Sequence, residues 1–235
     1  GICLVRQHRG DFNHIFISDK ITDYHLLGGQ TYLFPLYHYN SDDKKINQRT
    51  LDGNEIKSSM GKTSNFKEEF LNFVKEAYPN QEITPEEILS YIYAVLHSDK
   101  YRKNYKEFLK IDFPRIPFVK DYKKFKKLSD LGNKLINIHL LKISFKKNIA
   151  KFDKEGDCEV SFVRYEDTKI HINKNQYFGN IKKDVWNFSV GDFQVLDKWL
   201  KTRKDRKLSY KEIQVFIQAV DSISETIDLM NKLES

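Results

Sequence analysis

The sequence of 235 residues has little that would fix a small fold covalently, since it contains only 2 cysteines and 5 prolines. Cys3 and Cys158 form no CxxC pair and no regularly spaced framework, which favours a reducing cytoplasm as the location. Long apolar runs are also lacking, so no segment is predicted to cross a bilayer. The apolar run near the start, Ile2–Val5, is too short for a signal peptide. We expect the sequence to be an excised piece of a longer protein whose missing part lies upstream.

Catalytic motifs are equally scarce. The sequence has neither the glycine-rich turn that holds S-adenosylmethionine nor the Asn/Asp-Pro-Pro-aromatic loop that an amino methyltransferase needs. Asp112–Arg115 has the wrong residue order for that loop, and we interpret it as a helix end that sets the chain direction. Gly61–Thr63 matches the tail of a phosphate-binding P-loop, but Ile56 stands where the first glycine of that loop is required.

A metal-dependent nuclease stays an alternative because Glu55 and Lys57 follow Asp42, Asp43 and Asp52. A carboxylate beside a Glu-x-Lys pair can hold a divalent ion and polarise a water molecule. The polar, glycine-containing surroundings favour a solvated loop instead, since metal sites need rigid support around their ligands. The alternative would use Asp43, Glu55 and Lys57.

The histidines show no metal-binding pattern such as HExxH. His97 and His139 lie in apolar helical stretches and are predicted to be hydrogen-bonded core residues. His8, His14 and His25 share the first part of the chain with several aspartates but form no short ligand pair. We therefore assign no catalytic residue and no metal ligand.

Positive charge is in excess, with 40 Lys+Arg against 33 Asp+Glu, a net charge of +7 and a pI of about 9.1. This balance suits a polyanionic partner, because phosphates attract such a surface. Scattered lysines that serve only solubility are the alternative. The hydrophobic share of 40%, with 14% aromatic residues, excludes a disordered chain.

Residue periodicity predicts both strands and helices. Strands are expected at Ile2–Gln7, His14–Ser18, Thr31–Tyr39, Val160–Tyr165 and Lys169–Asn173. Helices are expected from Asn65 to Pro79, after Thr84, from Asp99 to Leu109, from Asp121 to Lys142, from Gly191 to Lys201, and after Ser209. Asn65 with Glu68, Thr84 with Glu87, and Ser209 with Glu212 have the spacing of capping boxes.

These elements predict an α+β fold, a mixed domain with an N-terminal β region, a central helical region, a short β segment and a long C-terminal helix. We expect one domain over residues 1–235. Its predicted parts are a β-rich lobe (1–63) whose long loop Asn40–Thr63 faces the partner, a helical part (64–150), a β-containing segment (151–207) and a docking helix (208–235). In that helix, apolar residues recur at a and d positions, which indicates docking on the domain's own core or on a neighbour.

Side chains that read phosphates and base edges occur in several clusters. Asn and Gln pair with adenine, and Arg or Lys with guanine, if they reach the major groove. The candidate DNA-binding residues are Arg6, Gln7, Arg9, Lys44, Lys45, Asn47, Gln48, Arg49, Lys62, Asn173, Lys174, Asn175, Gln176, Arg203, Lys204 and Arg206. Polar surface turns are the alternative for the Asn/Gln clusters. A solvated linker is the alternative for the basic run at 201–207.

Four stretches carry a family resemblance. They are Thr31–Tyr39 (TYLFPLYHY), His97–Pro117 (HSDKYRKNYKEFLKIDFPRIP), Ile172–Phe178 (INKNQYF) and Val185–Tyr210 (VWNFSVGDFQVLDKWLKTRKDRKLSY). In order and spacing they resemble the C-terminal target-recognition domain of type ISP restriction-modification enzymes. The resemblance implies a non-catalytic domain that binds duplex DNA and reads a short asymmetric site.

The resemblance also implies what surrounds this domain. The upstream chain would carry an adenine-N6 methyltransferase, a helicase-like ATPase and a nuclease. Their cofactors would be S-adenosylmethionine, ATP and Mg²⁺, with none expected in this segment. The target adenine would be flipped into the neighbouring methyltransferase pocket. The aromatic and aliphatic family motifs are expected to build the scaffold and the methyltransferase-facing surface.

Two further interpretations stay open. A specificity domain from a fused type IIG restriction-methylation enzyme would share the role without the translocating motor. A protein-interaction module would use residues 209–233 as its partner-binding surface.

Overall fold

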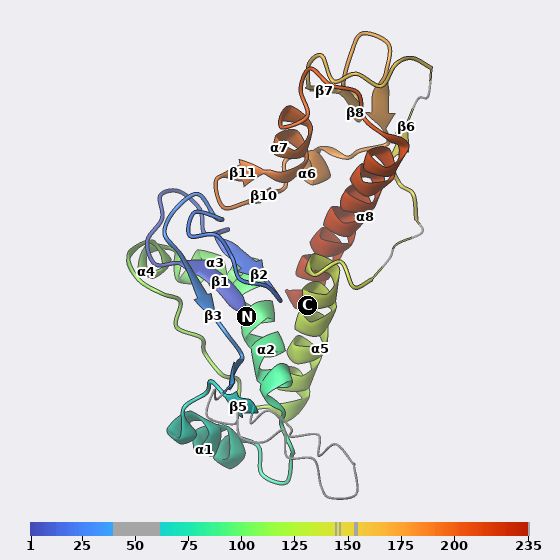
Figure 1. The fold of residues 1–235 in the computed structure, drawn as a ribbon. Helices are drawn as coiled ribbons and strands as arrows, with labels where there is room; N and C mark the ends of the chain where they lie inside the picture. The colour runs from blue at the N-terminus through green and yellow to red at the C-terminus, as the bar shows by residue number, and fades with distance from the viewer. Residues whose placement is uncertain (40–61, 144, 146, 153–154, 235) are drawn as a thin grey trace, which may run out of the picture.

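The computed structural model describes residues 1–39, 62–143, 145, 147–152 and 155–234 (Figure 1). It confirms the α+β prediction, because helices and small antiparallel sheets alternate along the chain and the last element is a long helix. Among the described helices, none combines the length and the apolar character that a bilayer span requires.

The N-terminal sheet has the strand order β2-β1-β3 and is antiparallel. Its strands are β1 (Ile2–Val5), β2 (Ile15–Ile17) and β3 (Thr31–Phe34). All four residues of β1 are buried, since Ile2 and Leu4 enter one core cluster while Cys3 and Val5 pack with Leu27. The expected strand Thr31–Tyr39 is wrong in one respect. It divides at Pro35, which has no N–H to donate, and continues as β4 (Tyr37–Tyr39), paired with β5 (Lys62–Ser64).

The central helices are α1 (Glu68–Ala77), α2 (Pro85–His97), α3 (Asp99–Asn104), α4 (Lys106–Ile111) and α5 (Tyr122–His139). Thr84 and Glu87 form the predicted capping box of α2. The predicted box at Asn65 is wrong, because α1 begins after Lys67 and the Asn65 amide donates to the Pro35 carbonyl. The helix expected from Asp99 to Leu109 breaks at Tyr105 into α3 and α4.

Helices α2 and α5 run parallel and in close contact. Ser129 near the start of α5 donates to the Glu87 carbonyl, and His139 at its end meets Tyr93. Gly132 permits this approach, since a Cβ atom at this position would lie 1.9 Å from the Ser90 carbonyl oxygen. The pair forms the centre of the N-terminal core, a cluster that also includes β1, β2 and Leu229 of the last helix.

The C-terminal part contains a four-stranded antiparallel sheet of order β6-β9-β8-β7. Its strands are β6 (Lys151–Phe152), β7 (Arg164–Glu166), β8 (Lys169–His171) and β9 (Tyr177–Gly179). They are followed by α6 (Lys183–Trp186), β10 (Ser189–Val190), β11 (Phe193–Gln194) and α7 (Val195–Lys201). Both expected elements here are shorter than predicted. Only the last two residues of the strand expected at 160–165 belong to β7, and the helix expected from Gly191 begins at Val195 because β11 pairs with β10.

The last helix, α8 (Tyr210–Leu233), begins at the predicted capping box of Ser209 and Glu212. Its first part is buried in the C-terminal core, a cluster that also contains β8, β9 and α7, through Ile213, Phe216 and Val220. Its last part packs against α5 and α2 and places Leu229 in the N-terminal core. In Figure 1, α8 runs from the upper part of the molecule down to α5. The prediction that its apolar seam docks on the domain's own core is confirmed.

A second connection between the two parts is the β10–β11 hairpin. Val190 packs beside Cys3, Val5 and Leu27, and the Gly191 N–H donates to the Asn13 carbonyl at 3.0 Å. The Asn13 amide donates in turn to the Ser189 hydroxyl at 3.1 Å. The hairpin therefore attaches the C-terminal part to the N-terminal sheet.

Candidate nucleic-acid interface

Several of the sequence-predicted residues lie outside the described residues. These are Lys44, Lys45, Asn47, Gln48 and Arg49 of the DNA-binding prediction, and Asp42, Asp43, Asp52, Glu55 and Lys57 of the nuclease alternative. The described residues that flank this segment are Tyr39 and Lys62, which pair across the β4–β5 hairpin.

Lys62 is the first residue of β5, and its exposed side chain lies beside the first turn of α2. Its ammonium group lies 3.5 Å from the centre of the Tyr37 ring and 3.7 Å from Glu86 Oε1. The Tyr37 hydroxyl donates to the same Glu86 oxygen at 2.5 Å. Burial, followed by this hydrogen bond, raises the pKa of Tyr37 to about 12, so the hydroxyl stays protonated at neutral pH. The arrangement fixes the tyrosine under the ammonium group and leaves the lysine turned to solvent.

Arg6, Gln7 and Arg9 are exposed after the end of β1, as a DNA-facing role requires. Arg6 is already engaged, because its Nε lies 3.0 Å from Asp112 Oδ1. The Gln7 amide donates to the Ile111 carbonyl at 3.4 Å. Gln7 and Arg9 line an open hollow of about 510 Å³. Of the two cations here, Arg6 is ion-paired with Asp112, so Arg9 is the better candidate for a phosphate contact.

The cluster at residues 173–176 is mainly a structural turn. Gln176 is fully buried at 0% exposure, and its Oε1 accepts from the Cys158 N–H and from the Asn173 amide. Asn173 Oδ1 accepts from the backbone N–H groups of Asn175 and Gln176, which closes the turn. The prediction that Gln176 reads bases is therefore wrong for this conformation, since its side chain is used inside the fold. Lys174 and Asn175 remain exposed at the tip.

The basic run before α8 also contains both residues that stabilise the fold and a residue that is exposed. Arg203 lies 3.6 Å from the Trp199 ring centre and donates to Glu212 at 3.2 Å, while Arg206 donates to the same carboxylate at 2.6 Å. Hydrogen bonds from Arg206 and from Ser209 lower the pKa of Glu212 to about 2. The two arginines therefore hold the start of α8. Only Lys204, among the three residues predicted here, is an exposed cation without such a role in the described structure.

The structure adds a group of cations that the sequence analysis missed. Lys120, Lys123, Lys124 and Lys127 are exposed along the start of α5. Lys123 and Lys124 lie four and three residues before Lys127, which places these three on one side of the helix, while Lys120 precedes the cap residue Asp121. The first turn of α5 contains no acidic residue, and the Asp121 carboxylate accepts from the Lys124 N–H as the helix cap. The signal was present in the sequence as that spacing, opposite the buried positions Phe125 and Ser129.

The neighbouring Lys126 pairs with two carboxylates. Lys126 lies 2.7 Å from Glu87 and 3.1 Å from Asp130, and these two contacts raise its pKa. Because α2 and α5 run parallel, Lys62 and the lysine side of α5 lie at the same end of the helix pair (Figure 1). Exposed lysines thus gather at this end of the helix pair, and lysine ammonium groups are the kind of side chain that contacts phosphates.

No curated protein matches the chain significantly. Three solved structures are similar over nearly the whole chain. They are the ATP-dependent type ISP restriction-modification enzyme LlaBIII bound to DNA (TM-score 0.72, 22% identity, 99% of this chain and 16% of that one), a nuclease-deletion mutant of the type ISP enzyme LlaGI with a DNA substrate mimic (0.66, 21%, 99% and 21%), and a DrdV–DNA complex (0.71, 18%, 98% and 24%).

The identities are low, so these structures establish the fold, and the chain spans only about a quarter or less of each protein. The family is decided by a sequence model that matches residues 1–232 and describes a specificity domain rather than a catalytic one. The chain therefore belongs to the type ISP C-terminal specificity domain family.

Proposed function

We propose that this specificity domain recognises a short sequence in double-stranded DNA and directs a restriction-modification enzyme to it. The observation that carries the proposal is the family match over residues 1–232. It is supported by the similarity of the fold to enzymes whose structures were determined with DNA. The exposed lysines at one end of the helix pair, Lys62 and those of α5, offer a place for the DNA backbone. Base readout is assigned to those sequence-predicted DNA-binding residues whose side chains are exposed.

The bond-making chemistry belongs to other parts of the polypeptide. We propose an upstream adenine-N6 methyltransferase, an ATP-dependent motor and a nuclease, which would use S-adenosylmethionine, ATP and Mg²⁺ in the cytoplasm. This domain would contribute the address and no cofactor site for that chemistry.

One exposed apolar surface suits the contact with the methyltransferase. Phe108 and Ile111 of α4 are 69% and 62% exposed, and Tyr105 beside them is 39% exposed. With Phe113 and Pro114 they line a hollow of about 460 Å³. An apolar group of this kind is costly to leave in water, and it falls within a family motif that was expected to face the methyltransferase. Replacing Phe108 by Ser should weaken methylation by the full-length enzyme while leaving DNA binding by this domain unchanged.

The decisive experiment is selection of duplexes from a randomised DNA pool by the purified chain, followed by affinity measurements over a range of salt concentrations. We expect one short sequence to be enriched and its affinity to fall steeply with salt, because bound cations release counterions from the phosphates. Absence of any sequence preference would contradict the proposal.

The same preparation distinguishes the alternatives. Association with a protein through residues 209–233, without salt-dependent DNA binding, would favour the interaction module. Metal-dependent DNA cleavage that is lost on Glu55→Ala would favour the nuclease.

A further inference from the structure

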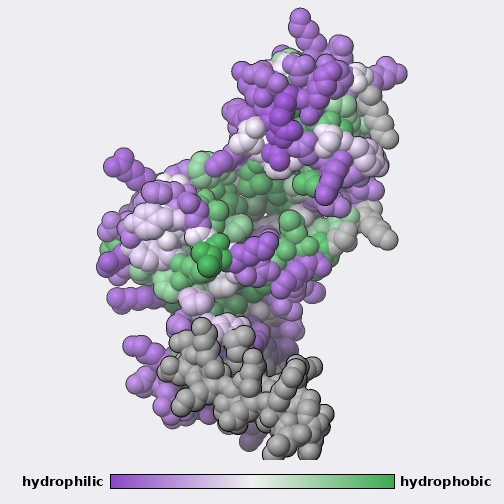
Figure 2. All heavy atoms as spheres, in the orientation of Figure 1, coloured by the Kyte–Doolittle hydropathy of each residue, from purple (hydrophilic) through white to green (hydrophobic). Residues whose placement is uncertain are grey.

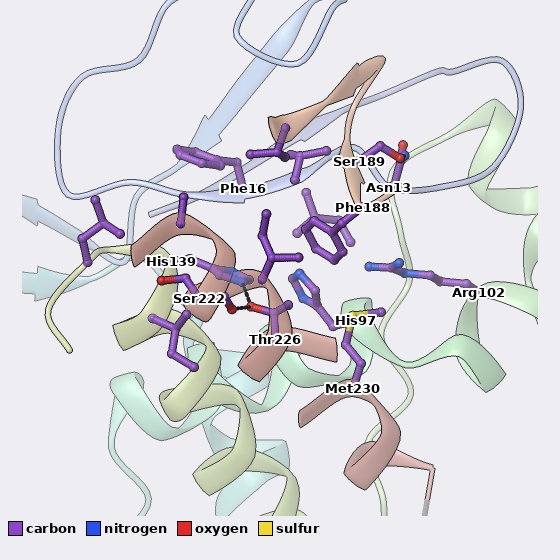
Figure 3. A pocket seen from close by; sticks show the side chains of 17 residues that line it. Asn13, Phe16, His97, Arg102, His139, Phe188, Ser189, Ser222, Thr226 and Met230 are labelled. Carbon is purple, nitrogen blue, oxygen red and sulfur yellow. Dashed lines mark hydrogen bonds between the residues drawn. The ribbon is translucent and has the colours of Figure 1, made fainter. Parts of the chain in front are cut away.

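A cavity of about 250 Å³ lies where the two parts of the molecule meet. Its walls come from β2, α2, α3 and α5 on one side and from the β10–β11 hairpin and α8 on the other (Figure 3). In the space-filling view, apolar side chains reach the surface in this middle region, below the hydrophilic upper end (Figure 2). The volume corresponds to about eight water molecules at their liquid density.

Most of the lining is apolar, and the polar groups at its base already satisfy one another. The Thr226 hydroxyl donates to the Ser222 carbonyl at 2.8 Å, so its oxygen accepts from His139 Nε2 at 3.0 Å. The other ring nitrogen of His139 then accepts from the Tyr93 hydroxyl at 2.7 Å. Burial lowers the pKa of His139 to about 4, which keeps this ring neutral. The network joins α2, α5 and α8 and adds no charge to the cavity.

His97 is neutral for the same reason. Its Nδ1 lies 2.8 Å from the Tyr93 carbonyl, which can only accept, so this nitrogen carries the proton. Burial, with the nearby Arg102 charge, holds the pKa of His97 well below its ordinary value. The ring therefore presents a neutral wall to the cavity.

Arg102 is the exception. It is the one charged side chain among the described residues that line the cavity, and none of these residues is acidic. Its Nε donates to the Leu96 carbonyl at 2.7 Å, but no carboxylate of the described chain lies within ion-pair distance of the guanidinium. Figure 3 shows the guanidinium directed towards His97 and Phe188. Burial lowers the pKa of this guanidinium to about 10.

Arg102 is half-buried, and the Asp99 carboxylate acts on it only from beyond ion-pair distance. A partly desolvated cation without a direct ion pair is unfavourable, and folded proteins normally pair such a group with an anion. A guanidinium binds carboxylates and phosphates through two parallel N–H donors, which fixes the orientation of the anion. The remaining wall, with Phe16, Ile138, Val190 and Ile223, favours an apolar body.

We propose that this cavity binds a small organic anion, with its carboxylate or phosphate on Arg102 and its apolar body between α8 and the β10–β11 hairpin. Such a ligand would contact both parts of the molecule at once. Its binding would therefore stabilise their relative placement, independently of any contact with DNA.

The test uses thermal unfolding of the full chain with benzoate as the probe. We expect benzoate to raise the Tm by about 3–6 °C at ten times its Kd, because a ligand that binds only the folded state stabilises it by mass action. Phenyl phosphate in a parallel measurement distinguishes a phosphate ligand from a carboxylate ligand. Benzamide, which has the same shape without the charge, should produce a much smaller rise, and so should inorganic phosphate, which lacks the apolar body.

Two variants complete the design. Arg102→Met keeps the length of the side chain and should abolish the benzoate response. It also loses the hydrogen bond to the Leu96 carbonyl, so the response of each variant is measured against its own unliganded Tm. Ala219→Leu adds bulk to the α8 wall and should weaken the response while Arg102 stays in place. The proposal is overturned if neither benzoate nor phenyl phosphate raises the Tm of the wild-type chain. An equal effect of benzamide or inorganic phosphate, or a full response in Arg102→Met, would overturn it as well.

Discussion

Glu212 occupies the third position of α8 and accepts hydrogen bonds from Ser209, Arg203 and Arg206. One carboxylate thus closes the helix start and fixes the two arginines beside it. Arginines in a basic run are easily interpreted as DNA contacts, but here their first role is internal. The distinction between a cation that holds the fold and one that faces a partner is made by single contacts of this kind.

Replacing Glu212 by Gln separates these two roles, since glutamine can still complete a capping box but cannot pair with the arginines. In Glu212→Gln we expect the free energy of unfolding to fall by less than about 1 kcal/mol for each of the two partly exposed ion pairs with arginine that are lost. Glu212→Ala should cost about 1 kcal/mol more, because the cap is lost as well. Urea unfolding at pH 7 measures both.

The pH dependence of the free energy of unfolding provides the control for the Glu212 variants. The folded pKa of Glu212 is about 2, below its ordinary value of 4.5. The unfolded chain therefore binds the proton first, and the stabilisation is complete above pH 4.5 and is lost as the pH falls towards 2. This loss should be smaller in Glu212→Gln. An identical acid profile in the two proteins would contradict the assignment.

The buried histidines His97 and His139 differ from the charged Glu212, because desolvation keeps both of them neutral. The folded pKa of His139 is about 4 against an ordinary 6.5, and that of His97 is also lowered. Between these values the unfolded chain binds more protons, so stability should fall as the pH drops from 6.5 towards 4. The expected slope is about 1.4 kcal/mol per pH unit for each histidine. Urea titrations between pH 5 and 6.5 measure it, and a flat profile would exclude neutral core histidines.

At the scale of elements, α5 has two sides with different tasks. One side packs against α2 so closely that only glycine fits at position 132. The opposite side carries exposed lysines near its start, where the positive end of the helix dipole makes cations unfavourable. A polyanion lying along this side would compensate that cost.

Replacing Lys120, Lys123, Lys124 and Lys127 together by Gln should weaken DNA binding and flatten its salt dependence. Each phosphate that a lysine no longer neutralises should reduce the slope of log affinity against log salt by about 0.9. A matched control removes the same charge elsewhere, at Lys100, Lys103, Lys182 and Lys183, which are exposed on α3 and around the start of α6. Equal weakening in both variants would show that net charge alone matters, and no change in the first would remove α5 from the DNA-binding surface.

Over the whole molecule, the features that depend on neighbouring residues were predictable and those that depend on distant contacts were not. Thr84 and Ser209 start their helices as predicted, because a capping box is complete within four residues. Asn65 fails as a cap because both ends of its side chain are bonded to distant residues, Oδ1 to His38 Nε2 and Nδ2 to the Pro35 carbonyl. Gln176 looked like a base reader, but the fold buries it against Cys158.

The attachment of the two parts through the β10–β11 hairpin also required the structure. Gly191 has φ of +58°, and a Cβ atom there would lie 2.6 Å from the Leu27 carbonyl oxygen. Gly191→Ala should therefore detach the hairpin and lower the free energy of unfolding. Gly10→Ala is a matched control, since Gly10 has φ of +81° but open space around it.

The two tryptophans, Trp186 and Trp199, both lie in the C-terminal part, so their fluorescence follows that part alone, whereas circular dichroism follows all helices. In Gly191→Ala the two urea transitions should separate, while in wild type and Gly10→Ala they should coincide. Coincident transitions in all three proteins would mean that the hairpin does not couple the parts.

Both cores are completed by α8, and the other helices and strands that the structure describes all precede it in the chain. The N-terminal sheet and the α2–α5 pair are synthesised long before Leu229 arrives to cover them, and the C-terminal sheet lacks Phe216 until the same moment. During translation the nascent polypeptide therefore exposes two incomplete apolar surfaces until α8 has been synthesised. The packing of α8 then completes both cores, and the interval before it is the one in which chaperones are most needed.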